Sequence, residues 1–202
     1  MNRVFVKKGD PLYKYTIKFM EESWGTKGKG IFPGCQPISI ERKHFDILEK
    51  NKYVVCEKTD GTRYMMIALQ YENQRVCVFI NRALEMFTVP LNFRLAVFKG
   101  TILEGELYEN TFMVYDCLMT CGEVVGNQGF LERLEYCKKT VKKAMVMNTD
   151  LISLKVKTFH LHQNFKNFMD KYLPNIKQEI DGLIFTPINE PIRIGTHETM
   201  FK

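Results

Sequence analysis

Short segments rich in β-branched and aromatic residues follow one another through the middle of the chain, and this pattern constrains the fold more than any other. Residues of these types favour extended strands, while the glycine, asparagine and charged clusters between the segments favour turns. The pattern predicts an antiparallel meander followed by a hairpin with Glu109 and Asn110 at its turn. The expected strands cover residues 53–57, 63–69, 75–81, 85–89, 101–107 and 111–118.

The rest of the chain supplies helices and a few further strands. Apolar residues at helical spacing predict helices over residues 129–146 and 163–173. An earlier helix is expected over residues 40–50, with Ser39 as its N-terminal cap. Strands and helices occur in runs instead of strict alternation, which indicates an α+β fold built on antiparallel sheet. Two more strands are expected, over residues 155–160 and 183–186.

Composition and patterning bound the class of protein. No repeat or linker interrupts the chain, so a single domain over residues 1–202 is expected. Residues 1–30 give no readable signal, and residues 25–34, GTKGKGIFPG, predict a flexible basic loop. The chain is 45% hydrophobic and 26% charged, without a signal peptide or an apolar run of about 20 residues, which predicts a soluble, non-secreted protein with no membrane partner. Its net charge of +6 weakly favours phosphate-bearing partners.

The cysteines and histidines do not predict a metal site. Six cysteines form no closely spaced pair and lie mostly inside apolar segments. We therefore expect reduced core thiols of an intracellular protein, not a disulfide frame or a zinc site. The four histidines lack the spacing of metal ligands, so a histidine-bound metal is not expected.

The sequence KTDGTR at residues 58–63 lies between two predicted strands and carries the most distinctive chemistry. A lysine at a strand end, followed by a glycine turn, is presented toward a cleft. Such a lysine can be a nucleophile where nearby positive charge or desolvation lowers its pKa, because only the neutral amine attacks. An ordinary surface hairpin is the alternative that these residues alone leave open.

Further motifs follow KTDGTR in order, and together they resemble those of the covalent nucleotidyltransferases. This family comprises the mRNA capping guanylyltransferases and the ATP-dependent DNA and RNA ligases. Asn81 and Glu104 depart conservatively from the family pattern, which usually has aspartate at both positions. The later motifs are FINR at 79–82, LEGEL at 103–107, VYD at 114–116, DGLIF at 181–185 and MFK at 200–202. The features that lean toward guanylyltransferases are FPGCQP at 32–37, DGLIFTP at 181–187 and IGTH at 194–197.

The resemblance implies a fold and a set of roles. The fold would be an antiparallel-sheet nucleotidyltransferase domain, ATP-grasp-like, with flanking helices. Lys58 would become linked to a nucleoside monophosphate, Asp60 would orient it or stabilise its turn, and Asp181 would bind Mg²⁺ or Mn²⁺. Lys202 would bring positive charge to the α-phosphate and lower the pKa of Lys58. The expected nucleotide-binding residues are Arg63, Arg82, Glu106, Tyr115, Lys157 and Lys202.

The nucleotide-binding residues divide by the part of the nucleotide that they would hold. Arg63 and Arg82 have planar guanidinium groups suited to ribose hydroxyls or phosphate oxygens, although surface arginines are the alternative. Glu106 could accept a bond from a ribose hydroxyl. Tyr115 is the candidate to stack on the base, with a core aromatic residue as the alternative, and Lys157 is the candidate donor to guanine O6.

The implied activity is that of an mRNA guanylyltransferase. GTP and Lys58 would give lysyl-GMP and pyrophosphate, and the GMP would pass to the 5′-diphosphate end of RNA. The alternatives are the adenylation domain of an ATP-dependent RNA or DNA ligase, and a nucleotide- or RNA-binding module without full activity. RNA triphosphatase and cap methyltransferase are expected as separate domains or proteins, and the expected location is the nucleus, or a cytoplasmic factory for a viral protein.

The family usually carries an OB-fold domain after the fifth motif. The chain stops at Lys202, so the C-terminal OB-fold is expected to be absent, and truncation of a longer chain is the favoured explanation. A fragment without that domain is expected to bind GTP but to form the covalent adduct poorly.

Overall fold

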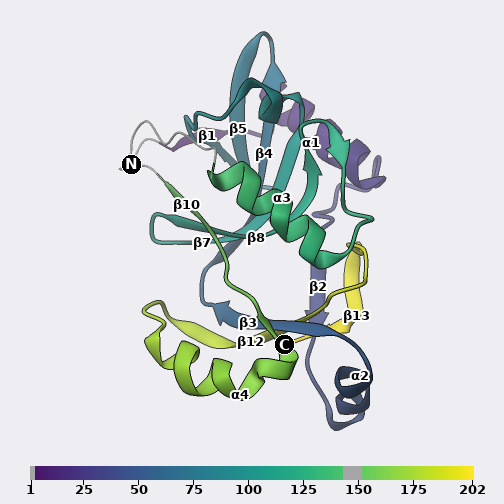
Figure 1. Ribbon diagram of the computed structural model, residues 1–202. Coiled ribbons are helices and arrows are strands. Elements are labelled where there is room, and N and C mark those ends of the chain that lie inside the picture. Colours follow the sequence, from purple (N-terminus) through teal and green to yellow (C-terminus); the bar gives the residue numbers. More distant parts are fainter. Residues whose placement is uncertain (1–2, 143–151) are drawn as a thin grey trace.

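The computed structural model describes residues 3–142 and 152–202, which form two β-sheets. Figure 1 shows the larger sheet above the smaller one. The larger sheet has the order β1-β6-β5-β4-β7-β8-β10, with β9 paired to β8, and the smaller has the order β11-β3-β12-β13-β2. The larger sheet contains β1 (Val4–Val6), β4 (Thr62–Tyr71), β5 (Gln74–Asn81), β6 (Met86–Thr88), β7 (Thr101–Tyr108), β8 (Thr111–Thr120), β9 (Glu123–Val124) and β10 (Ser153–Val156). The smaller contains β2 (Cys35–Ile38), β3 (Tyr53–Thr59), β11 (His160–Leu161), β12 (Ile180–Pro187) and β13 (Gly195–Phe201).

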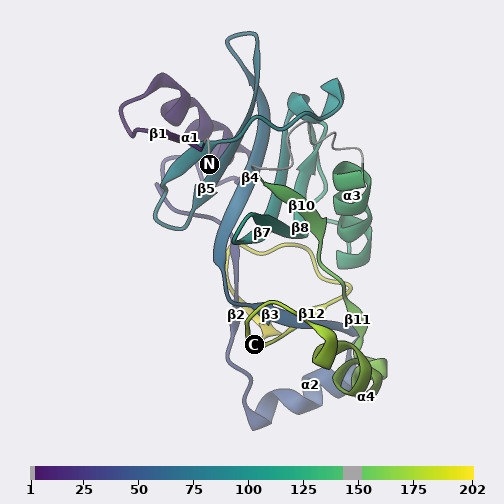
Figure 2. The same cartoon turned by 90° about the vertical axis from the view of Figure 1, so that its left-hand side faces the viewer.

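Helices cover both faces of the larger sheet. Figure 2 shows α1 and α3 on opposite faces of it, and α2 and α4 beside the smaller sheet. Because both faces are covered, Met65, Met66 and Ile67 of β4 are all fully buried, although their side chains alternate between faces. The helices are α1 (Pro11–Trp24), α2 (Phe45–Lys50), α3 (Phe130–Lys142) and the short α4 (Phe165–Asn167), with further helical turns at Arg42–His44, Leu95–Lys99, His162–Asn164, Phe168–Tyr172 and Leu173–Asn175.

Each face of the larger sheet has its own hydrophobic core. Phe79, Phe87 and Phe112 form the aromatic centre of one core, where α3 contributes Cys137. The core on the other face receives Met20 and Trp24 of α1, among others. Residues 1–30 were expected to carry no signal, yet they form β1 and α1. Helical signals are present there, namely proline in the first turn and a left-handed glycine, Gly25 with φ 64°, at the end.

Strands β4, β5 and β6 confirm most of the predicted antiparallel meander, and the α+β class is confirmed. The first strand expected in the meander, β3, lies instead in the smaller sheet and pairs with β12. The hairpin of β7 and β8 turns where Glu109 and Asn110 were expected. Two pairs are parallel, β8 with β10 and β2 with β13, and each joins segments distant in the sequence. Such long-range pairs leave no local sequence signal.

Several predicted boundaries change. The helix expected over 40–50 is a 3₁₀ turn followed by α2, and Glu41 caps it reciprocally with His44, so Ser39 does not. The strand expected over 155–160 divides into β10 and β11, and the helix expected over 163–173 is a series of short turns. Helix α3 confirms most of the helix expected over 129–146, whose residues 143–146 lie outside the described residues.

The predicted basic loop and the cysteines also differ in detail from expectation. The Glu21 carboxylate accepts hydrogen bonds from the backbone N–H groups of Gly28 and Gly30, both at 2.9 Å, which holds a loop expected to be flexible. All six cysteines are free thiols, as expected, but Cys121 is exposed while the others are buried.

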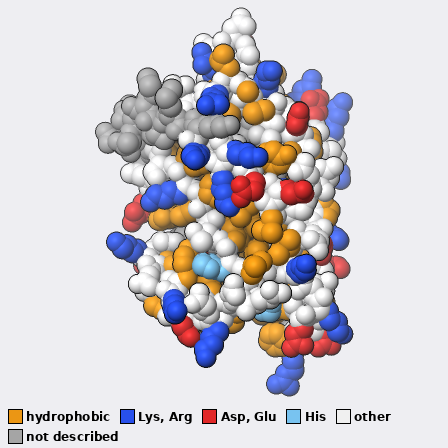
Figure 3. All heavy atoms as spheres, viewed as in Figure 1, with side chains coloured by type: hydrophobic (Ala, Val, Ile, Leu, Met, Phe, Trp, Pro, Cys, Tyr) orange, Lys and Arg blue, Asp and Glu red, His pale blue; other side chains and the backbone are white. Residues whose placement is uncertain are grey.

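No helix in the described ranges is long and apolar enough to cross a membrane. Figure 3 shows charged side chains of both signs scattered among the hydrophobic ones on one face.

The two sheets are joined directly by the turn between β3 and β4. Strand β3 pairs with β12 in the smaller sheet, whereas β4 pairs with β5 and β7 in the larger. The turn consists of Asp60 and Gly61, and a Cβ at Gly61 would lie 2.9 Å from both Glu106 Cγ and the Leu107 carbonyl oxygen. Glycine is therefore required where the chain passes close to β7. Because this short turn joins the two sheets, a cleft lies between them.

Candidate active site

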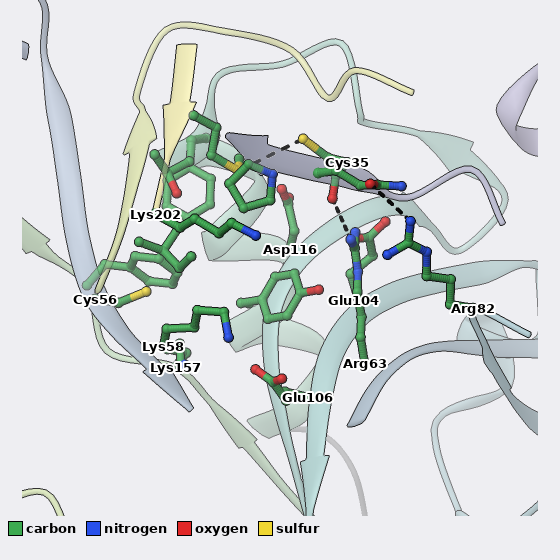
Figure 4. Close-up of a pocket in the computed structure, with 18 residues that line it drawn as sticks. Cys35, Cys56, Lys58, Arg63, Arg82, Glu104, Glu106, Asp116, Lys157 and Lys202 are labelled. Carbon is green, nitrogen blue, oxygen red and sulfur yellow. Dashed lines mark hydrogen bonds and ion pairs between the residues drawn. The ribbon is translucent and has the colours of Figure 1, made fainter. Parts of the chain in front are cut away.

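A cavity of about 280 Å³ lies in the cleft between the two sheets. Figure 4 shows Lys58, Lys157 and Lys202 approaching it from one side, with Glu106, Arg63 and Arg82 on the other. The side chains that line it are Cys35, Gln36, Pro37, Cys56, Lys58, Arg63, Arg82, Glu104, Glu106, Tyr115, Asp116, Phe130, Lys157, Phe159, Ile184, Thr186, Met200 and Lys202.

Lys58 lies near the end of β3 and forms an ion pair with Asp181 of β12. The Lys58 Nζ atom lies 2.7 Å from Asp181 Oδ1 and 2.6 Å from Oδ2. An irregularity in the pairing with β3, between Ile180 and Gly182, interrupts β12 at Asp181. The bulge brings the carboxylate to the ammonium group, and about a third of the lysine side chain remains exposed. The structure therefore brings together two of the predicted residues, the nucleophile and the metal ligand.

Glu106 of β7 lines the cavity on the side of the larger sheet. Burial raises the pKa of its carboxyl group, while the positive charges of Lys157 and Lys58 oppose that increase. The two lysines therefore offset only part of the effect of burial on this carboxyl group. The ionised form can accept a hydrogen bond from a hydroxyl group.

Arg63, the first charged residue of β4, has protein partners for its guanidinium. It donates hydrogen bonds to the Cys35 carbonyl oxygen and to the Glu104 carboxylate. The guanidinium lies 5.4 Å from the Phe32 ring centre and 6.0 Å from that of Tyr115. Burial lowers the pKa of Arg63, but the charge and hydrogen bond of Glu104, together with Tyr115 and Cys35, raise it overall. The arginine therefore stays charged and fixed in place at the cavity wall.

Further charged residues, to which the sequence analysis assigned no role in the site, stabilise this wall. Arg133 of α3 binds Asp116 with two hydrogen bonds, at 2.8 and 3.1 Å. Burial raises the pKa of Glu104, with Arg63 opposing and Asp116 reinforcing the increase. Glu104 and Asp116 could have been recognised from the sequence, because they are charged residues inside predicted strands. Nothing in the local sequence of α3 indicated that Arg133 is buried, with 2% of it exposed.

Lys157 lies between β10 and β11 and is 5% exposed. Its ammonium group donates to the Glu57 carbonyl oxygen at 2.7 Å and to Thr59 Oγ1 at 2.9 Å. The Glu57 carboxylate lies 3.6 Å away and supplies the opposite charge that a buried ammonium group needs. An ammonium group has three N–H donors, so one remains for a ligand in the cavity.

The cavity has an apolar part. Phe130 and Phe159 meet edge to face with ring centres 4.8 Å apart, and Ile184 also lines this part. Burial raises the pKa of the Tyr115 hydroxyl well above 10.0, so the ring stays neutral. Apolar and aromatic side chains of this kind can pack against the flat face of a purine base. The sequence analysis had named only Tyr115 for this task.

The remaining predicted residues lie at the edge of the cavity or outside it. Arg82 is exposed and donates to Gln36 Oε1 at 3.2 Å, and Lys202 is exposed at the end of β13. Asp60 is exposed on the turn and does not line the cavity. Its backbone N–H donates to the Glu179 carbonyl oxygen at 2.9 Å, which holds the turn against the segment before β12.

The carboxylates fit a weakly held divalent cation. Among the described residues, no group of three or more His, Cys, Asp or Glu side chains could hold a metal ion. Mg²⁺ commonly binds one or two carboxylates together with substrate phosphates and water. Asp181, whose side chain is 48% exposed beside the cavity, and Glu106 within it provide oxygen ligands of this kind.

Comparison with known proteins identifies the family. Residues 12–202 match the family described as mRNA capping enzyme, catalytic domain. The chain belongs to this family. It is 30% identical to the mRNA-capping enzyme subunit alpha of Neurospora crassa over 85% of this chain and 50% of that protein, and 30% identical to the mRNA-capping enzyme of Danio rerio over 83% of this chain and 31% of that protein. This member of the family thus spans half or less of these relatives' length.

Solved structures show the same fold at low sequence identity. A mycobacterial DNA ligase D complexed with ATP matches this family member with a TM-score of 0.53 and 11% identity, over 87% of this chain and 60% of the other. A structure from a study of Lig E DNA ligases matches with a TM-score of 0.52 and 16% identity, over 85% and 68%. The predicted nucleotidyltransferase fold is thereby confirmed, and the ligases share it.

Proposed function

We infer that the chain is the nucleotidyltransferase unit of an mRNA guanylyltransferase, with Lys58 as its nucleophile. The observation that carries this inference is the position of Lys58, whose ammonium group enters a cavity that is also lined by a carboxylate, further cations and aromatic side chains. Membership of the capping-enzyme family supports GTP as the substrate.

In the first step, deprotonated Lys58 Nζ forms a bond to the α-phosphorus of GTP. The bond from that phosphorus to the oxygen bridging to the β-phosphate breaks, and pyrophosphate leaves. Arg82 and Lys202 lie at the cavity edge, where they can bind the phosphate oxygens, and Lys157 and Glu106 can hold the base and the ribose. A bound Mg²⁺ or Mn²⁺ would supply charge neutralisation on the phosphates.

In this scheme the Asp181 carboxylate can interact either with Lys58 or with a divalent cation. It holds Lys58 as an ion pair, which favours the protonated amine. A cation on Asp181 would weaken that pairing and favour the neutral, nucleophilic amine. Asp60 is then a positioning residue, acting through its turn.

In the second step, an oxygen of the 5′-diphosphate end of RNA attacks the same phosphorus. The N–P bond breaks and the lysine amine is regenerated. We propose that an RNA triphosphatase supplies the diphosphate end, that a cap methyltransferase acts on the product, and that the nucleus is the place of action, as for mRNA processing in eukaryotic relatives.

The test is incubation with α-labelled GTP or ATP and a divalent ion, followed by denaturing electrophoresis. Lys58→Ala and Lys58→Arg are compared with the unchanged chain, because the arginine keeps the charge without an attacking amine. Label from GTP that both variants lose would support the proposal. Label from ATP alone would instead indicate a ligase, and GTP binding without label would indicate a nucleotide-binding module.

A further inference from the structure

A second hollow, of about 500 Å³, adjoins the cavity on the surface. Gln36 and Arg82 line both, so the two are continuous at that point. The other residues that line the hollow are Gly30, Ile31, Phe32, Ala83, Leu84, Ile194 and Gly195. Apart from Arg82, none of the residues that line this hollow has a role in the GTP reaction proposed above.

The basic loop forms one rim of the hollow. Lys27 and Lys29 are exposed, and Gly30, which follows directly, lines the hollow. Neither lysine forms an ion pair with a carboxylate in the part of the chain that the structure describes. Their positive charges are therefore available to a phosphate.

The loop is held in shape from inside. Glu21 is 8% exposed, and its carboxylate accepts the hydrogen bonds from Gly28 and Gly30 described above. These bonds lower the pKa of Glu21, so it stays ionised. Gly28 and Gly30 have φ angles of 73° and 59°, which other residues rarely adopt. A buried charge thus orders a segment whose exposed side chains are lysines.

The hollow also exposes apolar side chains beside these charges. Ile31 is 43% exposed and Ile194 is 44% exposed, and the buried Phe32 also lines the hollow. Apolar surface beside lysine and arginine is the combination that binds single-stranded nucleic acid, because bases pack on the former and phosphates pair with the latter. A small anion alone would have no use for the apolar part.

We propose that this hollow, with the rim formed by Lys27 and Lys29, binds the first nucleotides of the acceptor RNA. The inference rests on the proposed function, since the acceptor end must reach the phosphorus held at Lys58. Arg82 lies at the junction of the two sites and can bind the 5′-diphosphate. The first base packs against Ile31 and Ile194, and the following phosphates meet the lysines.

The test compares Lys27→Ala/Lys29→Ala with the matched control Lys166→Ala/Lys171→Ala. The control removes two exposed lysines beside α4, at the opposite edge of the smaller sheet. Labelled lysyl-GMP is formed first and then mixed with a short RNA that carries a 5′-diphosphate. The rate of GMP transfer is measured against RNA concentration and salt, and thermal unfolding verifies that each variant is folded.

We expect the loop variant to form lysyl-GMP at the unchanged rate but to need roughly ten-fold more RNA for half-maximal transfer. The slope of log affinity against log salt should become less steep by roughly 1.4, because two phosphate contacts are lost and each contributes about 0.7 on a single strand. The control should match the unchanged chain in both respects.

Two results would overturn the proposal. One is that the rate of GMP transfer depends on RNA concentration in the same way for the loop variant and for the control. The other is a higher KM for GTP with unchanged RNA dependence, which would assign the hollow to the triphosphate. If the unchanged chain forms no lysyl-GMP, the proposed function fails separately, and fluorescence anisotropy with the same labelled RNA still decides whether the lysines bind it.

Discussion

Single residues in this protein act through partners that lie far away in the sequence. Arg63 illustrates this, because its guanidinium is held by Glu104 of β7 and by a carbonyl group of β2. The Glu104 side chain is 3% exposed and that of Arg63 is 24% exposed. Removing one partner of a buried ion pair leaves the other charge desolvated and unpaired.

We therefore predict that Glu104→Gln lowers the free energy of unfolding by about 3–5 kcal/mol. Glu135→Gln is the control, because its pair with Lys138 on α3 is exposed and should matter little. Urea titration of both variants measures the difference. Equal midpoints for the two variants would contradict the structural role assigned to Glu104.

His197 should make stability depend on pH. It is 2% exposed, and burial lowers its pKa below 6.5, opposed by Glu190 and reinforced by Arg193. Between that lowered pKa and 6.5 the unfolded chain binds the proton and the folded chain does not, so stability falls as the pH falls through this range. We expect His197→Gln to lose less stability than the unchanged chain between pH 7.5 and 5.5.

Urea midpoints across this pH range test the histidine prediction. The interval from pH 7.5 to 8.5 is the internal control, since the imidazole is neutral there in both states. If the urea midpoints of His197→Gln and of the unchanged chain fall in parallel below pH 6.5, groups other than His197 cause the loss of stability in acid.

At the scale of elements, close approaches between strands fix the hairpins that carry the site. Gly105 lies in β7 between Glu104 and Glu106, and a Cβ there would lie 2.6 Å from Phe112 Cζ and 2.7 Å from the Met113 carbonyl oxygen. The backbone contact cannot be relieved by a change of rotamer. Packing alone therefore requires the glycine of the LEGEL motif.

We predict that Gly105→Ala destabilises the fold by about 1–3 kcal/mol, the usual effect of overpacking. Gly9→Ala is the matched control, because nothing lies within 4 Å of its added Cβ. Thermal or urea unfolding should separate the two. An unchanged free energy of unfolding in Gly105→Ala would show that β7 and β8 can move apart without loss of stability.

The strands that were predicted from the sequence and those that were missed differ in how far apart their pairing partners lie in the sequence. Strands β4 to β8 were predicted because each is bounded by turn signals and pairs with a strand next to it in the sequence. Strand β3 has the same local composition, although its partner β12 lies far away in the sequence. Strands β2 and β13 were missed because β2 is short, contains Pro37, and pairs in parallel with a strand at the far end of the chain. Likewise the motifs revealed Lys58 and Asp181, but the buried pairing of Arg133 with Asp116 exists only in the fold.

At the scale of the whole molecule, the cavity takes its lining from both sheets. Lys58 belongs to the smaller sheet and Glu106 to the larger, and a bound nucleotide would contact both. A ligand that binds only the folded state stabilises it by mass action. The sheets should therefore unfold together when the nucleotide is bound.

We predict that GTP at 100 times its Kd raises the free energy of unfolding by about 2.7 kcal/mol, or roughly 5–10 °C in Tm. Lys58→Ala limits the measurement to reversible binding, because it cannot form the adduct. Calorimetry with and without GTP measures the shift. Two separate transitions, of which GTP moves only one, would contradict the expectation that residues 1–202 form one domain.

The short turn between β3 and β4 also restricts how the sequence can change over evolution. Lys58 and Arg63 are five positions apart and stand in different sheets, joined through a turn packed against β7. An inserted residue would have no room in the turn, and a one-residue shift of β4 would carry Arg63 to the opposite face. We therefore expect related sequences to have no insertion or deletion between Lys58 and Arg63, even where individual residues in this segment differ.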